Sequence, residues 1–153
     1  MITRRLLAAL LLGGGSAVGV LAVGSAAGAT GPAQIRITDV ETKARLVHPV
    51  GGGWGGATEV IAQQLYNPSI SGRPIGRSQI VCTYVDSRNR TCLGTYQLPK
   101  GDIVVGGALQ TRLLYEVPIV GGTGLYDNAR GTVTVTATKF RPRREVLVFR
   151  LLG

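Results

Sequence analysis

The sequence is poor in the residue types that build most catalytic centres. Its 153 residues include one histidine, two cysteines and eight acidic residues, and aromatic side chains make up 5%. His48 has no partner at the spacing of a metal site, and there is no Cys-x-x-Cys motif. A nucleophile elbow is also missing, so His48 has no serine with which to form a hydrolase triad. We therefore predict no metal, no cofactor and no conventional nucleophilic site.

Helical periodicity is also lacking, whereas apolar and polar residues alternate along much of the chain. From Thr132 to Thr138, threonines alternate with Val133, Val135 and Ala137, the period of a strand with two different faces. The 23 glycines suit tight turns between short strands. The predicted strands are Gln34 to Val40 (with Lys43 to His48 either prolonging it or forming an added rim), Thr58 to Tyr66, Arg77 to Asp86, Arg90 to Leu98, Asp102 to Leu109, Thr111 to Ile119, Arg130 to Lys139 and Glu145 to Leu152.

Eight short strands without a helix predict an all-β fold, an eight-stranded antiparallel β-barrel. Closing the sheet from first strand to last removes its exposed edges. An interior of this size holds side chains or one small ligand. An immunoglobulin-like sandwich is the alternative, although the tryptophan that such domains carry between their cysteines is missing.

Residues 1–29 have the features of an export signal. Arg4 and Arg5 provide a basic start, an apolar run of small residues follows, and Ala27-Gly28-Ala29 offers a cleavage site. A permanent membrane anchor is the alternative, since the run is nearly long enough to span a bilayer. We expect cleavage after Ala29 and a secreted protein whose single barrel domain comprises residues 30–153.

Acidic residues are scarce relative to basic ones, and the formal net charge is +9. Removal of Arg4 and Arg5 with the signal leaves 15 basic and 8 acidic residues, or +7. Such a charge favours association with anionic surfaces, including cell-envelope polymers, but predicts no specific nucleic-acid partner. The one dense cluster, Arg141, Arg143 and Arg144, is either a solvated turn between two strands or a polyanion site.

Cys82 and Cys92 form an even pair behind an export signal, which predicts one disulfide. If their two strands form a hairpin that turns at Ser87, residues whose numbers sum to 174 face each other. Cys82 is then opposite Cys92.

Glycine-rich motifs in the second half of the chain resemble a known superfamily. They are Gly72-Arg73-x-x-Gly76, Cys92-x-Gly94-Thr95-x-x-Leu98-Pro99-x-Gly101, Gly106, and Gly121-Gly122-Thr123-Gly124-x-Tyr126-x-x-Ala129-Arg130-Gly131. In this order they are similar to the signature of the dirigent and allene oxide cyclase barrel-like superfamily. The resemblance implies an eight-stranded barrel, often a trimer, that binds a small hydrophobic molecule. It also implies a pocket role for Arg130, whereas the strand alternation favours a structural role for Arg130 on the outer face.

Strand parity nominates further candidate site residues. Tyr84 and Tyr96 share the face of the predicted cystine, where they either bind a ligand or pack as ordinary aromatic side chains. Trp54, flanked by glycines, is either a lid over the barrel mouth or a plug on the outside. Glu116 lies among apolar neighbours, where a carboxylate suited to proton transfer is one interpretation and a solvent-facing side chain the other.

Two functions remain open from the sequence. The first is an exported barrel that binds a small hydrophobic molecule and steers its cyclisation or coupling, a cyclase-like activity without metal or cofactor. The second is a non-enzymatic, cationic protein that associates with anionic envelope polymers.

Overall fold

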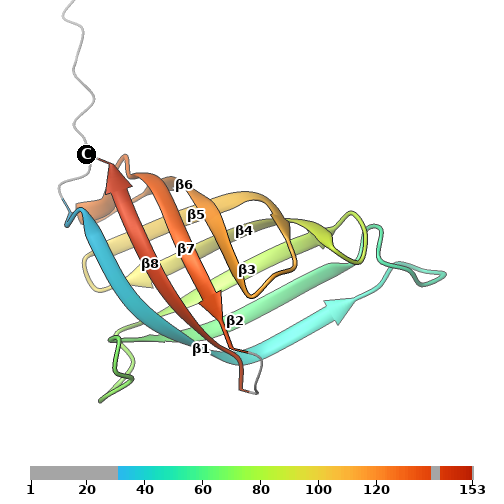
Figure 1. The fold of residues 1–153 in the computed structure, drawn as a ribbon, viewed down its shortest axis with the longest axis horizontal. Coiled ribbons are helices and arrows are strands. Elements are labelled where there is room, and N and C mark those ends of the chain that lie inside the picture. Colours follow the sequence, from blue (N-terminus) through green and yellow to red (C-terminus); the bar gives the residue numbers. More distant parts are fainter. Residues whose placement is uncertain (1–30, 139–141, 153) are drawn as a thin grey trace, which may run out of the picture.

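Eight antiparallel strands close into a barrel in the computed structural model, which describes residues 31–138 and 142–152 (Figure 1). Each strand pairs with its sequence neighbours, and the last pairs back to the first. The elements are β1 (Gln34–Val47), β2 (Thr58–Tyr66), β3 (Gly76–Tyr84), β4 (Asn89–Leu98), β5 (Gly101–Gln110), β6 (Leu114–Gly122), the 3-10 turn η1 (Gly124–Tyr126), β7 (Arg130–Ala137) and β8 (Arg144–Leu152). The predicted all-β, eight-stranded antiparallel barrel is confirmed.

The expected export signal and its cleavage site after Ala29 lie outside the described residues. Within the described residues, no helix is long and apolar enough to cross a bilayer.

Alternation along the strands decides which side chains form the core. In β7, Val133 and Val135 are buried inside the barrel, whereas Thr132 and Thr134 lie on its outer side. This is the orientation that the sequence predicts. The largest fully buried side chains include Tyr96 and Phe149, whose rings meet edge to face with centroids 5.1 Å apart.

The two ends of the barrel differ. We call the end with the β1–β2, β3–β4, β5–β6 and β7–β8 connections the cavity end, and the opposite end the packed end. Tyr126 of η1, Ile119 and Leu151 are buried at the packed end and belong to the apolar core. The packed end is therefore filled by apolar side chains.

Two glycine turns interlock at the packed end. Gly101 has φ +140°, and a Cβ there would lie 2.0 Å from the carbonyl oxygen of Thr123. Gly124 has φ +61°, and its Cβ would lie 2.4 Å from the carbonyl oxygen of Lys100. Only glycine allows the β4–β5 turn and the β6–β7 connection to approach this closely. These glycines therefore form tight turns between strands, the role for which the sequence suits them.

Strand β1 extends beyond the segment in which apolar and polar residues alternate most clearly. Lys43 to Val47 continue the strand past an irregularity after Glu41. The β1–β8 ladder ends at Val40 and Arg144, so this last part of β1 pairs with β2 alone. The β1–β2 hairpin therefore projects beyond the barrel at the cavity end (Figure 1).

Candidate functional site

One wall of the cavity end carries a buried ion pair with a tyrosine in its centre. Cross-strand pairing of Glu59 with Cys82 and of Tyr84 with Arg90 brings these side chains together on the inner face. Arg90 Nη1 lies 2.6 Å from Glu59 Oε2 and 3.0 Å from the Tyr84 hydroxyl, which itself donates to Glu59 Oε2 at 2.7 Å. Burial and this carboxylate raise the pKa of Tyr84, so the phenol stays protonated at neutral pH. Arg90 Nε is buried and has no hydrogen-bond partner among the described residues.

The cystine lies beside this cluster. Cys82 and Cys92 are directly opposite each other in the β3–β4 ladder and form a disulfide, as predicted from the hairpin register. Both are buried and line the cavity. The cystine therefore joins the two strands that carry Tyr84 and Arg90.

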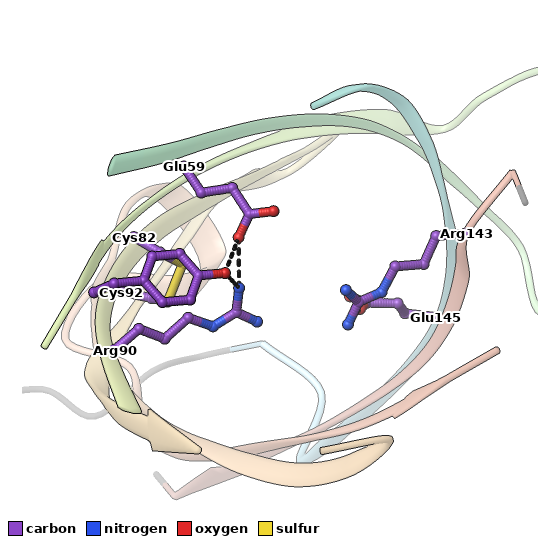
Figure 2. Close-up of a disulfide and its surroundings, with 7 residues drawn as sticks. Glu59, Cys82, Arg90, Cys92, Arg143 and Glu145 are labelled. Carbon is purple, nitrogen blue, oxygen red and sulfur yellow. Dashed lines mark hydrogen bonds and ion pairs between the residues drawn. A yellow bond between two sulfur atoms is a disulfide. The ribbon is translucent and has the colours of Figure 1, made fainter. Parts of the chain in front are cut away.

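The opposite wall carries a second cluster of charged side chains, of which Figure 2 shows Arg143 and Glu145. Arg143, immediately before β8, makes a 2.7 Å ion pair with Glu145. Gln63 donates to the other oxygen of Glu145 at 3.4 Å and accepts from Ser78 at 2.7 Å. Figure 2 shows the Arg143–Glu145 pair facing Glu59 and Arg90 across the barrel.

Asp39 is the most unusual member of the second cluster. It is fully buried opposite Glu145 in the β1–β8 ladder, and neither carboxyl oxygen has a well-formed hydrogen bond within the described residues. Burial, reinforced by the charge of Glu145, raises the pKa of Asp39 to about 9. The protonated form of Asp39 is therefore favoured at neutral pH.

A small cavity separates the two clusters. Its free volume is about 30 Å³, room for roughly two water molecules. Tyr96 and Tyr115 line it, and burial raises the pKa of both phenols. Neither hydroxyl has a hydrogen-bond partner among the residues that the structure describes. Apolar side chains complete the lining, among them Ile61, Ile80, Val105, Leu109, Val117 and Val135.

Two of the predicted aromatic site residues, Tyr84 and Trp54, lie together at this end, whereas Tyr96 lies deeper in the barrel, opposite Ser78 and Ile103 near the packed end. Tyr84 and Tyr96 are on the inner face, as their parity predicts. The Trp54 ring packs against Tyr84 with centroids 5.0 Å apart and against His48 at 5.4 Å, and Trp54 remains 40% exposed. Trp54 is thus at the rim beside Tyr84. Ligand binding by the three aromatic residues stays a prediction.

Arg130 and Glu116 lie elsewhere. Arg130 is exposed and donates to the carbonyl oxygens of Val120 and Ala129, at 3.2 and 2.9 Å. These bonds brace the β6–β7 connection, in line with the structural alternative for Arg130. Glu116 faces solvent, accepts from Thr134 at 3.0 Å and lies 3.6 Å from Arg150. The structure therefore does not bring either residue to the cavity.

The described part of the basic cluster before β8 is not one solvated turn, which corrects one of the two interpretations of the sequence. Arg143 turns into the barrel to reach Glu145, whereas Arg144 is exposed and Arg141 lies outside the described residues. Arg143 turns inward because Glu145, two residues on, is on the inner face of β8 and offers a buried carboxylate. The described part of the cluster is thus divided between the interior and the surface, which weakens the polyanion alternative.

Sequence reasoning missed the charged members of the two clusters as site residues, namely Glu59, Arg90, Asp39, Arg143 and Glu145. A signal was present: Asp39 follows Ile35 and Ile37 with strand period, and Glu145 precedes Leu147 and Phe149 in the same way. A carboxylate that falls on the same face of a strand as a series of apolar residues predicts a buried polar cluster.

Titration of Asp39 predicts a pH-dependent stability. Because the pKa of Asp39 is raised in the folded state, its contribution to the free energy of unfolding is fully present below the unfolded carboxyl pKa of about 4. It is lost progressively as pH rises through the folded pKa. We expect Asp39→Asn to gain stability relative to the parent protein between pH 5 and pH 9, as measured by thermal melting. Asp127→Asn, an exposed control, should show no such trend, and a constant difference between Asp39→Asn and the parent would contradict the assignment.

Comparison with known proteins identifies the fold. No protein-family model matches the chain, and no curated protein matches it by sequence. Among solved structures, pyocyanin demethylase matches with a TM-score of 0.65 and 21% identity, over 78% of this chain and 99% of its own. The pterocarpan synthase dirigent protein PsPTS1 matches at 0.58 and 16%, over 78% and 96%. The exo-specific intermolecular Diels-Alderase AbnU matches at 0.62 and 13%, over 78% and 97%.

The chain thus has the barrel fold shared by dirigent proteins, Diels-Alderases and pyocyanin demethylase, and the predicted resemblance is confirmed at the level of fold. One fold of this kind hosts different chemistries. The function must therefore be argued from this chain's own cavity.

Proposed function

We propose that this protein is an exported barrel that binds a small, mainly apolar molecule at its cavity end and holds it in one conformation that favours cyclisation or coupling. The observation that carries the proposal is a set of buried polar atoms around the cavity that have no hydrogen-bond partner in the described structure, namely the Nε atoms of Arg90 and Arg143 and the carboxyl oxygens of Asp39. Buried polar groups in folded proteins are almost always paired. Donors without partners that converge on one cavity between apolar walls are typical of a ligand site.

The donors indicate which chemistry the ligand carries. Glu59 and Glu145 already accept from arginines, whereas the buried Nε atoms of Arg90 and Arg143 have no acceptor in the described structure. The phenols of Tyr96 and Tyr115 line the same cavity. The raised pKa values of both tyrosines keep these hydroxyls as donors. The preferred ligand therefore offers an acceptor oxygen, such as a carbonyl, on an apolar body.

The cavity must enlarge before it can hold such a ligand. A free volume of about 30 Å³ is far below the roughly 300 Å³ of a typical ligand pocket. Arg143 is the side chain best placed to yield, because it is 29% exposed and belongs to the connection before β8 rather than to a strand. Movement of Arg143 toward solvent would join the cavity to the barrel mouth.

The proposed catalytic contribution is positional. Fixing a reactive conformer in a water-poor cavity removes orientational entropy from the barrier. Export through residues 1–29 is part of the proposal and is supported by the cystine, since disulfides persist in oxidising compartments.

Two probes of the same shape test the proposal, acetophenone with an acceptor oxygen and ethylbenzene without one. In NMR titrations we expect acetophenone to bind several-fold more tightly and to shift the signals of Tyr96 and Tyr115. Tyr96→Phe should reduce this preference by about 2- to 12-fold, the value of one hydrogen bond.

Tyr66→Phe is the matched control, because the Tyr66 hydroxyl bonds Gln64 away from the cavity. Equal binding of the two probes, or shifts confined to residues outside the barrel, would contradict the proposed function.

A further inference from the structure

Apolar side chains project from three neighbouring connections at the cavity end. Val50 is fully exposed, Val85 is 68% exposed, Leu113 43% and Trp54 40%. We call these four residues the apolar crown. Val50 and Trp54 come from the β1–β2 connection, Val85 from β3–β4 and Leu113 from β5–β6. Apolar side chains that cluster on the tips of separate loops mark an interaction surface rather than a gap in the core.

Backbone hydrogen bonds join the three connections into one rim. Gly56 N donates to the carbonyl oxygen of Tyr84, at the start of the β3–β4 connection, at 2.8 Å. Thr111 N, in the β5–β6 connection, donates to the carbonyl oxygen of Arg88 at 2.8 Å. These three connections are therefore linked side by side at the cavity end, with the β1–β2 hairpin reaching furthest (Figure 1).

The β1–β2 tip is built to project. Gly51, Gly52 and Gly53 all have positive φ, and a Cβ at any of them would meet nothing within 4 Å. Val50 thus extends from a glycine-lined tip that has open space around it. A protein partner usually offers a packed, complementary patch, whereas single apolar side chains on projecting tips fit a deformable medium.

The charge on the same rim has one dominant sign. Arg45, Arg88 and Arg112 are exposed there. In the described connections 48–57, 85–88 and 111–113 the single acidic residue is Asp86, whose carboxylate accepts from the backbone of Arg88 and Asn89. Cations beside exposed aliphatic and indole side chains match an anionic bilayer surface, in which the cations contact phosphates and the apolar groups reach the acyl boundary.

We propose that the apolar crown and its arginines dock the cavity end onto an anionic lipid bilayer. Trp54 and the two valines enter the interfacial region, and Arg88 and Arg112 contact lipid phosphates. The barrel mouth then faces the membrane, from which a lipophilic ligand would enter without crossing water. The docking surface stands independently of the proposed ligand chemistry.

Vesicle sedimentation tests the proposal with full-length mature protein. Vesicles of phosphatidylcholine with about 30% phosphatidylglycerol should bind it at least tenfold more tightly than pure phosphatidylcholine vesicles, with weaker binding at high salt. Trp54 is the only tryptophan, so its fluorescence emission should shift to the blue on binding.

Two pairs of variants separate docking from general attraction of a basic protein. The double variant Val50→Ser/Val85→Ser should reduce vesicle binding about tenfold. The control double variant Leu93→Ser/Val120→Ser, at two residues exposed on the barrel wall, should not.

The double variant Arg88→Gln/Arg112→Gln should weaken vesicle binding more than Arg36→Gln/Arg73→Gln, which removes the same charge at the packed end. Equal effects within either pair, no preference for anionic vesicles, or an unchanged Trp54 emission would overturn the proposal. Acetophenone binding should be unchanged in all four variants, so the two proposals fail separately.

Discussion

Arg90→Met is expected to lower the free energy of unfolding by about 3 to 5 kcal/mol, the largest single effect that we predict. Arg90 is 5% exposed and provides the ion pair of Glu59 and a hydrogen bond to Tyr84. Its removal leaves the Glu59 carboxylate partly buried without a cation. Because Glu59 retains 19% exposure, some solvation remains, and the lower half of that range is the better expectation. Urea denaturation measures the change.

Two further variants identify the cause. Arg77→Met removes an exposed arginine that donates to Gln97 on the outer face, and it should change stability by no more than about 0.5 kcal/mol. Adding Glu59→Leu to Arg90→Met should restore part of the loss, because no uncompensated charge then remains. If Arg90→Met cost no more than Arg77→Met, the buried pair would not stabilise this end of the barrel.

Loss of the cystine is the second large effect. Replacing both Cys82 and Cys92 by alanine should lower the free energy of unfolding by about 2 to 3 kcal/mol, since the cross-link closes a short loop in the unfolded chain. The β3–β4 ladder has eight paired positions, so the barrel should still form. Reductant should destabilise the parent protein to the same extent and leave the double variant unchanged. A parent protein insensitive to reductant, with a double variant of equal stability, would contradict this prediction.

The fold could be predicted from the sequence because its determinants are local. Alternation in Thr132 to Thr138 gives the inner and outer faces of β7, and a turn at Ser87 places Cys82 opposite Cys92. Both inferences need only neighbouring residues and the two-residue period of a strand. The predicted strand ranges consequently differ from the observed ones by only a few residues, and β1 continues to Val47, in agreement with one of the two alternatives for Lys43 to His48.

The charged cavity could not be predicted in the same way, because its contacts join strands that are distant in the sequence. Asp39 meets Glu145 only when β8 closes onto β1, and Glu59 reaches Arg90 across the intervening strand β3. A prediction from polarity alone would put these charged side chains on the outside of the barrel. Their position in the strand alternation, in phase with buried apolar residues, instead matches the inner face on which they lie. Glu116, by contrast, follows polarity and faces solvent.

Native mass spectrometry of the protein purified from the organism that makes it tests the central claim most directly. The account predicts a mature protein that begins at Thr30 and carries a bound small molecule. That molecule has an acceptor oxygen on an apolar body, and it is lost when Tyr96 and Tyr115 are both replaced by phenylalanine. A ligand-free mass for the parent protein, or a bound molecule that both tyrosine replacements leave in place, would contradict it.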